Sequence, residues 1–274
     1  MKGVSFGQYY PASSVFHRMD PRAKIILAVL YIVSTFLCKN VLSFAALTIS
    51  ALLLVILSRI PLRIMLRSLR PILFIVVFTS AINIFATRGA HRLTPEHWWL
   101  AIYEEGLWNA LFMVLRIVCL ILSTSIFLTY TTTPVSLANA LERLLSPLKR
   151  IKIPVHDFAM MMTIALRFIP TLSEETEKIM NAQKARGANF TTGSLFARAK
   201  ALIPILVPLF VSAFNRAFEL ATAMECRCYH GGEGRTQLNV LHYRASDFVA
   251  IVLVIGFGVG LWFLNRVDFL YRLG

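Results

Sequence analysis

Long apolar runs separated by short polar segments dominate this chain of 274 residues. The runs of membrane-spanning length, or close to it, occupy about 23–38, 41–58, 71–87, 107–130 and 246–265. About 20 helical residues are needed to cross ~30 Å of hydrocarbon, so the first two runs are near the short limit. The pattern predicts an all-α, polytopic integral membrane protein with about five transmembrane helices. In the last run, Gly256, Gly258 and Gly260 would allow close helix contact.

The middle of the chain, residues 131–245, has a different texture, because charged residues return and prolines interrupt the apolar runs. Its apolar stretches 155–170 and 201–214 are short and mixed with charge, which favours helices that lie along the membrane or pack on one another. Whether either stretch enters the bilayer stays open. We predict three parts: 1–130 with a polar arm and four membrane helices, 131–245 with cytoplasmic or interfacial helices, and 246–274 with the last membrane helix.

Composition agrees with a membrane protein and adds a strong positive charge. Hydrophobic residues make up 57% of the chain, charged residues only 15%, and the mean hydropathy is +0.66, which excludes an ordinary soluble domain. The formal net charge of +14 indicates contact with anionic lipid headgroups or with acidic partner surfaces. Nucleic acid is not a predicted partner, because the basic residues are spread through an apolar chain and no binding motif accompanies them.

The distribution of Lys and Arg predicts the orientation in the membrane. Of the 28 basic residues, 22 lie in the arm 1–24, the segment 59–70 and the middle part 131–245. The positive-inside rule places these segments, and with them the N-terminus, in the cytoplasm, and it places the C-terminus outside.

Four arginines follow the second apolar run, namely Arg59, Arg63, Arg67 and Arg70. Their spacing puts them on roughly one face of a short helix that begins after Pro61. We interpret this segment as an interfacial helix whose arginines contact anionic headgroups, each contact being worth about 1 kcal/mol. Contact with a partner protein is the alternative.

Two segments of the middle part, 181–190 and 222–230, repeat one pattern. Each carries one arginine, Arg186 or Arg227, between two small residues, and each follows a long stretch with helical spacing. The small neighbours are Ala185, Gly187, Cys226 and Cys228. We predict two helix tips that each present one arginine with little side-chain bulk around it. Gly187 is well placed to end its helix in the left-handed conformation.

An arginine between small residues is suited to docking. A planar guanidinium makes paired hydrogen bonds to carboxylate and carbonyl oxygens, and small neighbours let the backbone approach the partner. The alternative for Arg186 is that it only caps its own helix, where the helix dipole favours a base. Because the pattern recurs at Arg227, we favour docking into two grooves.

The sequence lacks the motifs of catalysis. It has no G-x-x-x-x-G-K-[ST] phosphate loop, so it does not bind ATP in that way, and no HExxH or GxSxG motif. Cys226, Cys228 and His230 have a spacing that metal sites use, but tetrahedral zinc needs a second ligand cluster and none is visible. We therefore predict no catalytic residue, no cofactor and no metal, and a membrane-embedded enzyme is disfavoured.

Ionisable groups are almost missing from the apolar runs. Arg116 is the exception, and Asp247 and Asp268 lie at boundaries. A proton- or sodium-driven carrier usually needs carboxylates or histidines inside the membrane. This argues against a stand-alone permease or channel, which is the alternative function. For Arg116, facing protein or water, we favour a structural role over a functional one.

Several short motifs are specific in combination and extend over nearly the whole chain. They are Gly7-Gln-Tyr, His17-Arg-x-Asp-Pro-Arg-x-Lys24, Arg167-Phe-Ile-Pro170, Glu174-Glu175, Ala182-Gln-Lys-Ala-Arg-Gly187, and Glu225-Cys-Arg-Cys-Tyr229 through Gly234-Arg-Thr236. Together they resemble the transmembrane T component (EcfT, CbiQ-like) of energy-coupling factor transporters, the shared ABC-type vitamin importers.

The resemblance implies a non-catalytic scaffold in the cell membrane of a prokaryote, bound to two ATPase subunits and to a small substrate-capture (S) subunit. In that family two motifs with a central arginine, at the ends of cytoplasmic coupling helices, dock the two ATPases. Here they match Ala185-Arg186-Gly187 and Cys226-Arg227-Cys228. The second departs from the commoner Ala-Arg-Gly form but keeps the arginine and the small flanks. The choice of vitamin or metal should belong to the capture subunit.

Overall fold

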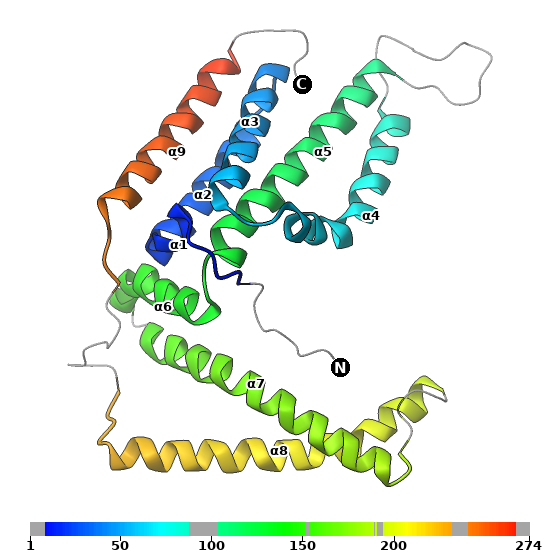
Figure 1. Ribbon diagram of the computed structural model, residues 1–274, viewed down its shortest axis with the longest axis vertical. Coiled ribbons are helices and arrows are strands. Elements are labelled where there is room, and N and C mark those ends of the chain that lie inside the picture. The colour runs from blue at the N-terminus through cyan, green and yellow to red at the C-terminus, as the bar shows by residue number, and fades with distance from the viewer. Residues whose placement is uncertain are drawn as a thin grey trace. The chain divides into compact units, whose positions relative to one another are not determined.

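The computed structural model describes residues 9–87, 103–151, 154–188, 190, 194–231 and 241–266. Within these ranges the chain is almost entirely helical and has no β-strand, which confirms the predicted all-α fold (Figure 1). The chain divides into two compact units. One is built from Ala138–Val240, and the other from Gly7–Leu137 together with Leu241–Gly274. The motif residues Gly7 and Gly234-Arg-Thr236 lie outside the described residues.

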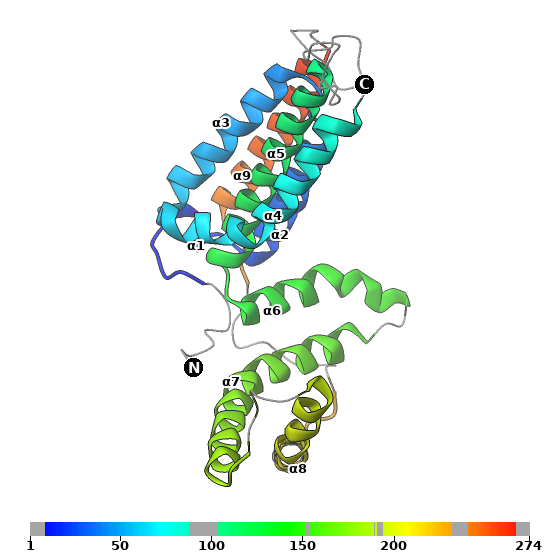
Figure 2. The ribbon, with the colours of Figure 1, turned by 90° about the vertical axis from the view of Figure 1, so that its right-hand side faces the viewer.

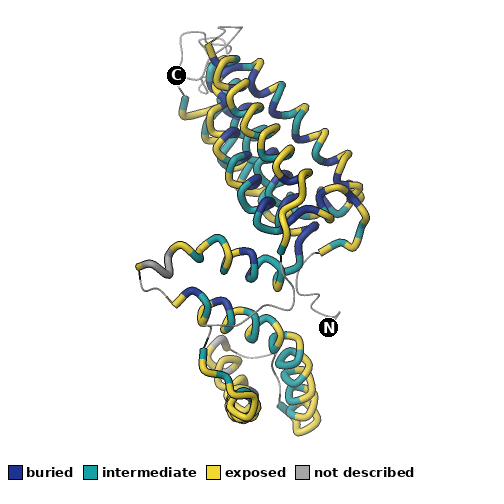
Figure 3. The backbone as a smooth tube through the Cα atoms, turned by 90° about the vertical axis from the view of Figure 1, so that its left-hand side faces the viewer, coloured by how far each residue is buried: buried dark blue, intermediate teal, exposed yellow. Residues whose placement is uncertain are grey.

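The second of these units, which we call the membrane body, is a bundle of long helices joined by short connections. Its elements are α1 (Val15–Arg18), α2 (Pro21–Leu37), α3 (Val41–Ser58), α4 (Leu62–Ala86), α5 (Glu104–Thr124), the π-helical turn η1 (Ser125–Tyr130) and α9 (Ala245–Leu264). Helix α5 packs against α2, α3 and α4, and α2 also packs against α9. The buried residues gather on the faces where these helices meet (Figure 3).

The remaining described elements are α6 (Pro134–Leu145), the 3₁₀ turn η2 (Ser146–Ile151), α7 (Val155–Ala185) and α8 (Leu195–Cys226). Helices α7 and α8 pack against each other, and most of their residues are exposed or half-buried (Figure 3). The ring of His156 at the start of α7 lies 2.8 Å from the Glu142 carboxylate of α6.

Among the described residues, five helices are long and apolar enough to cross a membrane, namely α3, α4, α5 with η1, Arg198–Cys226 of α8, and α9. The predicted number of about five is therefore confirmed, but the membership differs. Helix α2 has 17 residues and spans only about 26 Å, which is less than the ~30 Å thickness of the hydrocarbon core. The stretch 201–214, by contrast, belongs to an apolar helical segment of 29 residues.

Prolines account for most of the difference between the predicted and the observed helices, because several prolines lie inside helices. They are Pro71 in α4, Pro170 in α7, and Pro204 and Pro208 in α8. The predicted short helix after Pro61 and the predicted span 71–87 are thus one helix, α4. An interior proline removes one backbone hydrogen bond and bends a helix without always ending it. Figure 2 shows such a bend in α7.

The start of α2 is a capped helix end. Asp20 is its N-cap, and its carboxylate accepts a hydrogen bond of 2.8 Å from the Arg22 amide, while Pro21 occupies the first helical position. Asn40 is the N-cap of α3, in a capping box that Ser43 completes.

Arg22 forms an ion pair within the start of α2 and joins this end of the helix to the segment before α9. Two guanidinium nitrogens of Arg22 donate to the two Asp20 carboxylate oxygens over 3.1 and 2.9 Å. The Arg22 guanidinium also donates to the Leu241 carbonyl over 2.9 Å and lies 4.1 Å from the centroid of the Tyr243 ring. Burial by itself would raise the pKa of Asp20, but the hydrogen bonds and charge of Arg22 outweigh it and lower that pKa.

Two further charged side chains at this end of the bundle are buried, since Lys24 is 2% exposed and Asp247 is 0% exposed. The Lys24 ammonium donates to the Thr131 carbonyl over 2.7 Å. The Asp247 carboxylate accepts from the backbone amides of Arg244, over 2.8 Å, and Asp20, over 3.4 Å. These contacts join α2, the turn after η1 and the start of α9.

Arg116 has a structural role in the bundle, as expected from the sequence. Its guanidinium donates to the Cys38 carbonyl over 3.0 Å and lies 5.3 Å from the centroid of the Phe44 ring. Arg116 of α5 thereby binds the carbonyl that follows the last residue of α2.

Of the three glycines in α9, only Gly258 makes the close approach that was predicted for all of them. A Cβ atom at Gly258 would lie 2.9 Å from the Ser34 hydroxyl of α2, whereas one at Gly256 or Gly260 would meet no atom within 4 Å. Ser34 is 4% exposed, and its hydroxyl donates to the Leu30 carbonyl over 2.8 Å. The contact of α2 with α9 therefore depends on Gly258.

Gly258→Ala should destabilise the membrane body, because the added methyl group collides with the Ser34 hydroxyl. We expect a loss of about 1 kcal/mol, seen as a fall of about 2–4 °C in the thermal unfolding midpoint in detergent. Ser34→Ala in the same chain should restore the midpoint, because it removes the atom that the methyl group meets. Gly256→Ala and Gly260→Ala are matched controls and should be neutral or stabilising, since alanine favours a helix. Equal losses at all three glycines would contradict the assignment.

Candidate functional site

Arg186 and Arg227 both lie at the ends of long helices, as predicted. Arg186 is the first residue after α7, and Arg227 is the first residue after α8. Both side chains are exposed. Neither guanidinium has an ion pair or a side-chain hydrogen bond within the described part of the chain. No contact between the Arg186 guanidinium and the described residues therefore supports the alternative that Arg186 only caps its own helix.

The two tips share one backbone geometry. In each, an outer hydrogen bond closes six residues and an inner one closes the four residues within them, which is the Schellman pattern of helix ends. At the first tip, the Ala188 amide donates to the Gln183 carbonyl (outer bond, 3.0 Å) and the Gly187 amide to the Lys184 carbonyl (inner bond, 3.0 Å). At the second tip, the Tyr229 amide donates to the Met224 carbonyl (outer bond, 3.1 Å) and the Cys228 amide to the Glu225 carbonyl (inner bond, 2.8 Å). Each arginine occupies the same position in this turn.

A residue in the left-handed conformation follows each arginine. Gly187 has a φ of 87°, which confirms its predicted role as a helix terminator. Cys228 has a φ of 55°, a conformation that costs a residue with a Cβ atom roughly 1–2 kcal/mol. The departure from Ala-Arg-Gly at the second tip therefore leaves the turn unchanged and makes it more costly to form.

The residues beside the two arginines leave the guanidinium groups uncovered. Ala185, Gly187, Cys226 and Cys228 are all exposed. The two cysteines are free thiols, in contrast to the buried Cys38 and Cys119. Within the described residues, no three His, Cys, Asp or Glu side chains gather in the way that a metal site needs.

An ion pair joins the two helices that carry the tips. The Arg216 guanidinium of α8 donates to the Glu175 carboxylate of α7 over 2.9 Å. Hydrogen bonds from Ser212 and Arg216 lower the pKa of Glu175. Sequence reasoning found Glu175 within a motif but missed Arg216, because 41 residues separate the two and the spacing along one helix does not show a contact with another.

Apolar side chains complete the contact between α7 and α8. Phe168 and Leu172 of α7 face Ala217 and Leu220 of α8 across a groove of about 260 Å³. The groove and the ion pair together make α7 and α8 a packed pair, so that their two tips belong to one compact unit.

Known proteins resemble this chain over nearly its whole length. The family described as Cobalt transport protein (CbiQ) matches residues 12–238, which include both tips. The energy-coupling factor transporter transmembrane protein EcfT of Ruminiclostridium cellulolyticum is 49% identical over 94% of this chain and 94% of its own length. The EcfT protein of Brevibacillus brevis is 50% identical over 93% of this chain and 96% of its own length.

The EcfT protein of Bacillus subtilis is 46% identical over 97% of this chain and 99% of its own length. The chain therefore belongs to the CbiQ family, as an EcfT-type transmembrane component of energy-coupling factor transporters.

Proposed function

We propose that this chain couples ATP hydrolysis by two partner ATPases to the uptake of a vitamin or another micronutrient, which a separate substrate-capture subunit binds. In this proposal the chain catalyses nothing itself, and Arg186 engages one ATPase while Arg227 engages the other. The observation that carries the proposal is the presence of two exposed arginines in one shared backbone setting, at the ends of two packed helices.

The geometry of the tips supports docking. The Schellman turn ends each helix abruptly, so the arginine stands at the limit of the helix rather than along its side. Small neighbours allow the main chain to come close to a groove, and the planar guanidinium can then bind carboxylate or carbonyl oxygens in pairs. Equal turns at both tips suit two ATPases that resemble each other.

The contact between α7 and α8 supports transmission between the tips. Because the Glu175–Arg216 pair and the apolar groove hold the helices together, a displacement imposed on one tip is passed to the other helix. Coupling of this kind needs an element that moves as a unit.

An apolar ladder on α8 supports contact with another membrane subunit. Phe210, Phe214 and Phe218 are 65%, 50% and 68% exposed and follow one another at helical spacing. Their ring centroids are 4.6 and 6.5 Å apart in succession. Exposed aromatic rows of this kind favour a protein or lipid partner over water.

Arg186→Ala and Arg227→Ala should each weaken ATPase binding, because each leaves a desolvated groove of the partner without its cation. Such a loss costs roughly 2–5 kcal/mol, or at least about tenfold in affinity. We expect the double variant to abolish uptake in cells. Co-purification of the ATPases in mild detergent measures binding, and uptake of a labelled vitamin measures transport.

Arg198→Ala is the matched control, since Arg198 is an exposed arginine in the first turn of α8, outside both arginine motifs and at the opposite end of the helix from Arg227. It should leave binding and uptake unchanged. Wild-type uptake by the double variant would refute the docking role. Transport by the purified chain alone in liposomes would instead favour a permease.

Bulk beside the arginines should also block docking. Ala185→Phe or Cys226→Phe keeps the guanidinium but holds the backbone away from the groove, so we expect at least about tenfold weaker ATPase binding. Cys228→Gly is the control, because glycine takes the left-handed conformation freely and keeps the flank small. Circular dichroism should show unchanged helix content in all three variants. Normal binding by both Phe variants would show that small flanks are not required.

A further inference from the structure

A polar pocket lies in the membrane body where α3 ends. It has a volume of about 520 Å³ and is lined by the side chains of two arginines, Arg18 and Arg59, and two serines, Ser13 and Ser14. Both arginines are exposed, and no acidic residue lines the pocket. Neither guanidinium has an ion pair or a side-chain hydrogen bond to a described residue. The pocket therefore carries two uncompensated positive charges.

An apolar groove of about 440 Å³ adjoins the polar pocket and shares two of its lining residues, Val15 and Leu57. From there the groove runs between α3 and α9, where it is lined by Leu53, Val249 and Leu253 among other apolar side chains. These three residues are 52%, 58% and 67% exposed. Because α3 and α9 are both of membrane-spanning length and composition, the groove opens on the surface that faces lipid.

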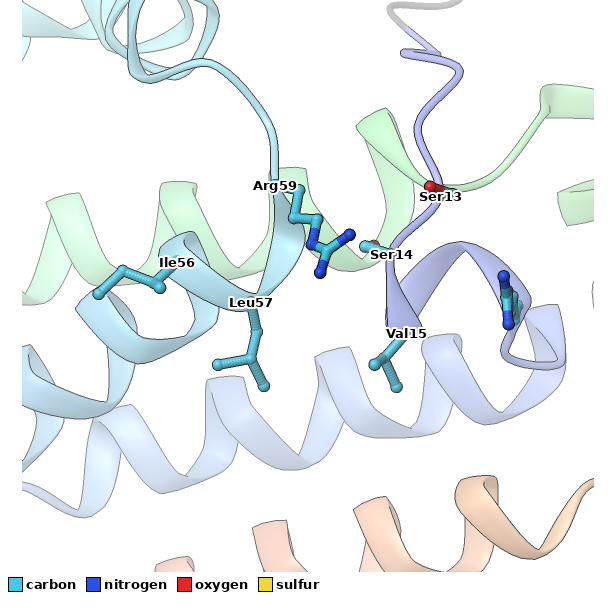
Figure 4. A pocket seen from close by; sticks show the side chains of 7 residues that line it. Ser13, Ser14, Val15, Ile56, Leu57 and Arg59 are labelled. Carbon is cyan, nitrogen blue, oxygen red and sulfur yellow. The ribbon is translucent and has the colours of Figure 1, made fainter.

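The backbone at Arg59 directs its side chain into the pocket. Arg59 ends α3 in the left-handed conformation, with a φ of 55° and a ψ of 26°. Glycine would take this conformation without strain, whereas a residue with a Cβ atom pays roughly 1–2 kcal/mol. Figure 4 shows the guanidinium turned towards Ser14, with Leu57 and Val15 extending together to one side. A costly arginine at a position that suits glycine points to a use for its charge.

We propose that this composite site binds one anionic phospholipid. The phosphate of the lipid binds the guanidinium groups of Arg18 and Arg59, and the Ser13 hydroxyl donates to one of its oxygens, whereas the Ser14 hydroxyl is held by His17. One acyl chain follows the groove past Leu57, Leu53 and Leu253. Charge complementarity selects the anionic headgroup, and continuity of the pocket with a lipid-facing apolar groove selects a lipid over a free anion.

In the test, the full-length chain is purified in mild detergent together with the subunits that accompany it. Dioleoyl phosphatidylglycerol is then added in increasing amounts, and native mass spectrometry counts the bound lipids. Dioleoyl phosphatidylcholine is the reference lipid. A basic residue near an anionic headgroup contributes about fivefold in affinity, so Arg18→Gln with Arg59→Gln should weaken phosphatidylglycerol binding about twenty-fold. Phosphatidylcholine has the same phosphate but also a choline cation that the two arginines disfavour, so the double variant should weaken its binding by less than about threefold.

Arg198→Gln with Lys200→Gln is the matched control, because it removes the same charge from exposed positions of α8, outside the pocket and outside the arginine-rich segment 59–70. It should change phosphatidylglycerol binding by less than about threefold. Equal losses in the two double variants would overturn the site and leave only a general attraction of the surface for anionic lipid.

Two further variants distinguish a bound lipid from a bound free anion. Arg59→Gly should bind phosphatidylglycerol about fivefold more weakly while its thermal unfolding midpoint stays equal or rises, because glycine relieves the strain. Leu253→Trp fills the groove, keeps both arginines and should still lose lipid binding. Full competition by glycerol phosphate, which has no acyl chain, would overturn the proposal in favour of a free-anion site. Wild-type binding by Leu253→Trp would do the same.

Discussion

The buried Lys24 ammonium and Asp247 carboxylate are the groups on which the membrane body depends. A charge that is removed from water costs several kcal/mol unless hydrogen-bond partners replace the lost water. Lys24 is bound by the Thr131 carbonyl, and Asp247 by two backbone amides. Since these partners come from three distant parts of the chain, the two charges are satisfied only when α2, η1 and α9 meet.

The contacts of Lys24 and Asp247 also position the residues around the start of α2. With Asp20 and Arg22 held beside Asp247, the polar arm that precedes α2 lies against the end of α3. That placement brings Arg18 and Arg59 to one pocket although 41 residues separate them in the chain. At the opposite end of α2, Arg116 binds the Cys38 carbonyl, so both ends of a helix too short to span the bilayer comfortably are held by cations.

Local features of the fold could be predicted from the sequence because neighbouring residues determine them. Asp20 and Pro21 start a helix through one amide and one fixed dihedral angle, and Gly187 ends one through its freedom at positive φ. Prolines were the main source of error. Pro71, Pro204 and Pro208 interrupt the hydropathy pattern, yet neighbouring turns keep the helices continuous.

Contacts between distant residues could not be predicted in the same way. Asp247 was interpreted as a boundary residue, and its link to Asp20 joins positions 227 residues apart. Arg216 was not singled out at all. The two arginine tips could be found because each is a short local motif and the motif occurs twice. That their turns have the same geometry could not be predicted, because it depends on the positive φ of Cys228, which takes the place of Gly187.

The cysteines at the second tip make the two tips chemically unequal. Cys226 and Cys228 carry exposed thiols on either side of Arg227, while Ala185 and Gly187 beside Arg186 carry nothing that an oxidant or a heavy metal attacks. Exposed thiols are open to oxidation and to capping by glutathione. Oxidation would thus add bulk and charge beside the Arg227 guanidinium and spare that of Arg186, so the proposed docking would be lost first at the second tip.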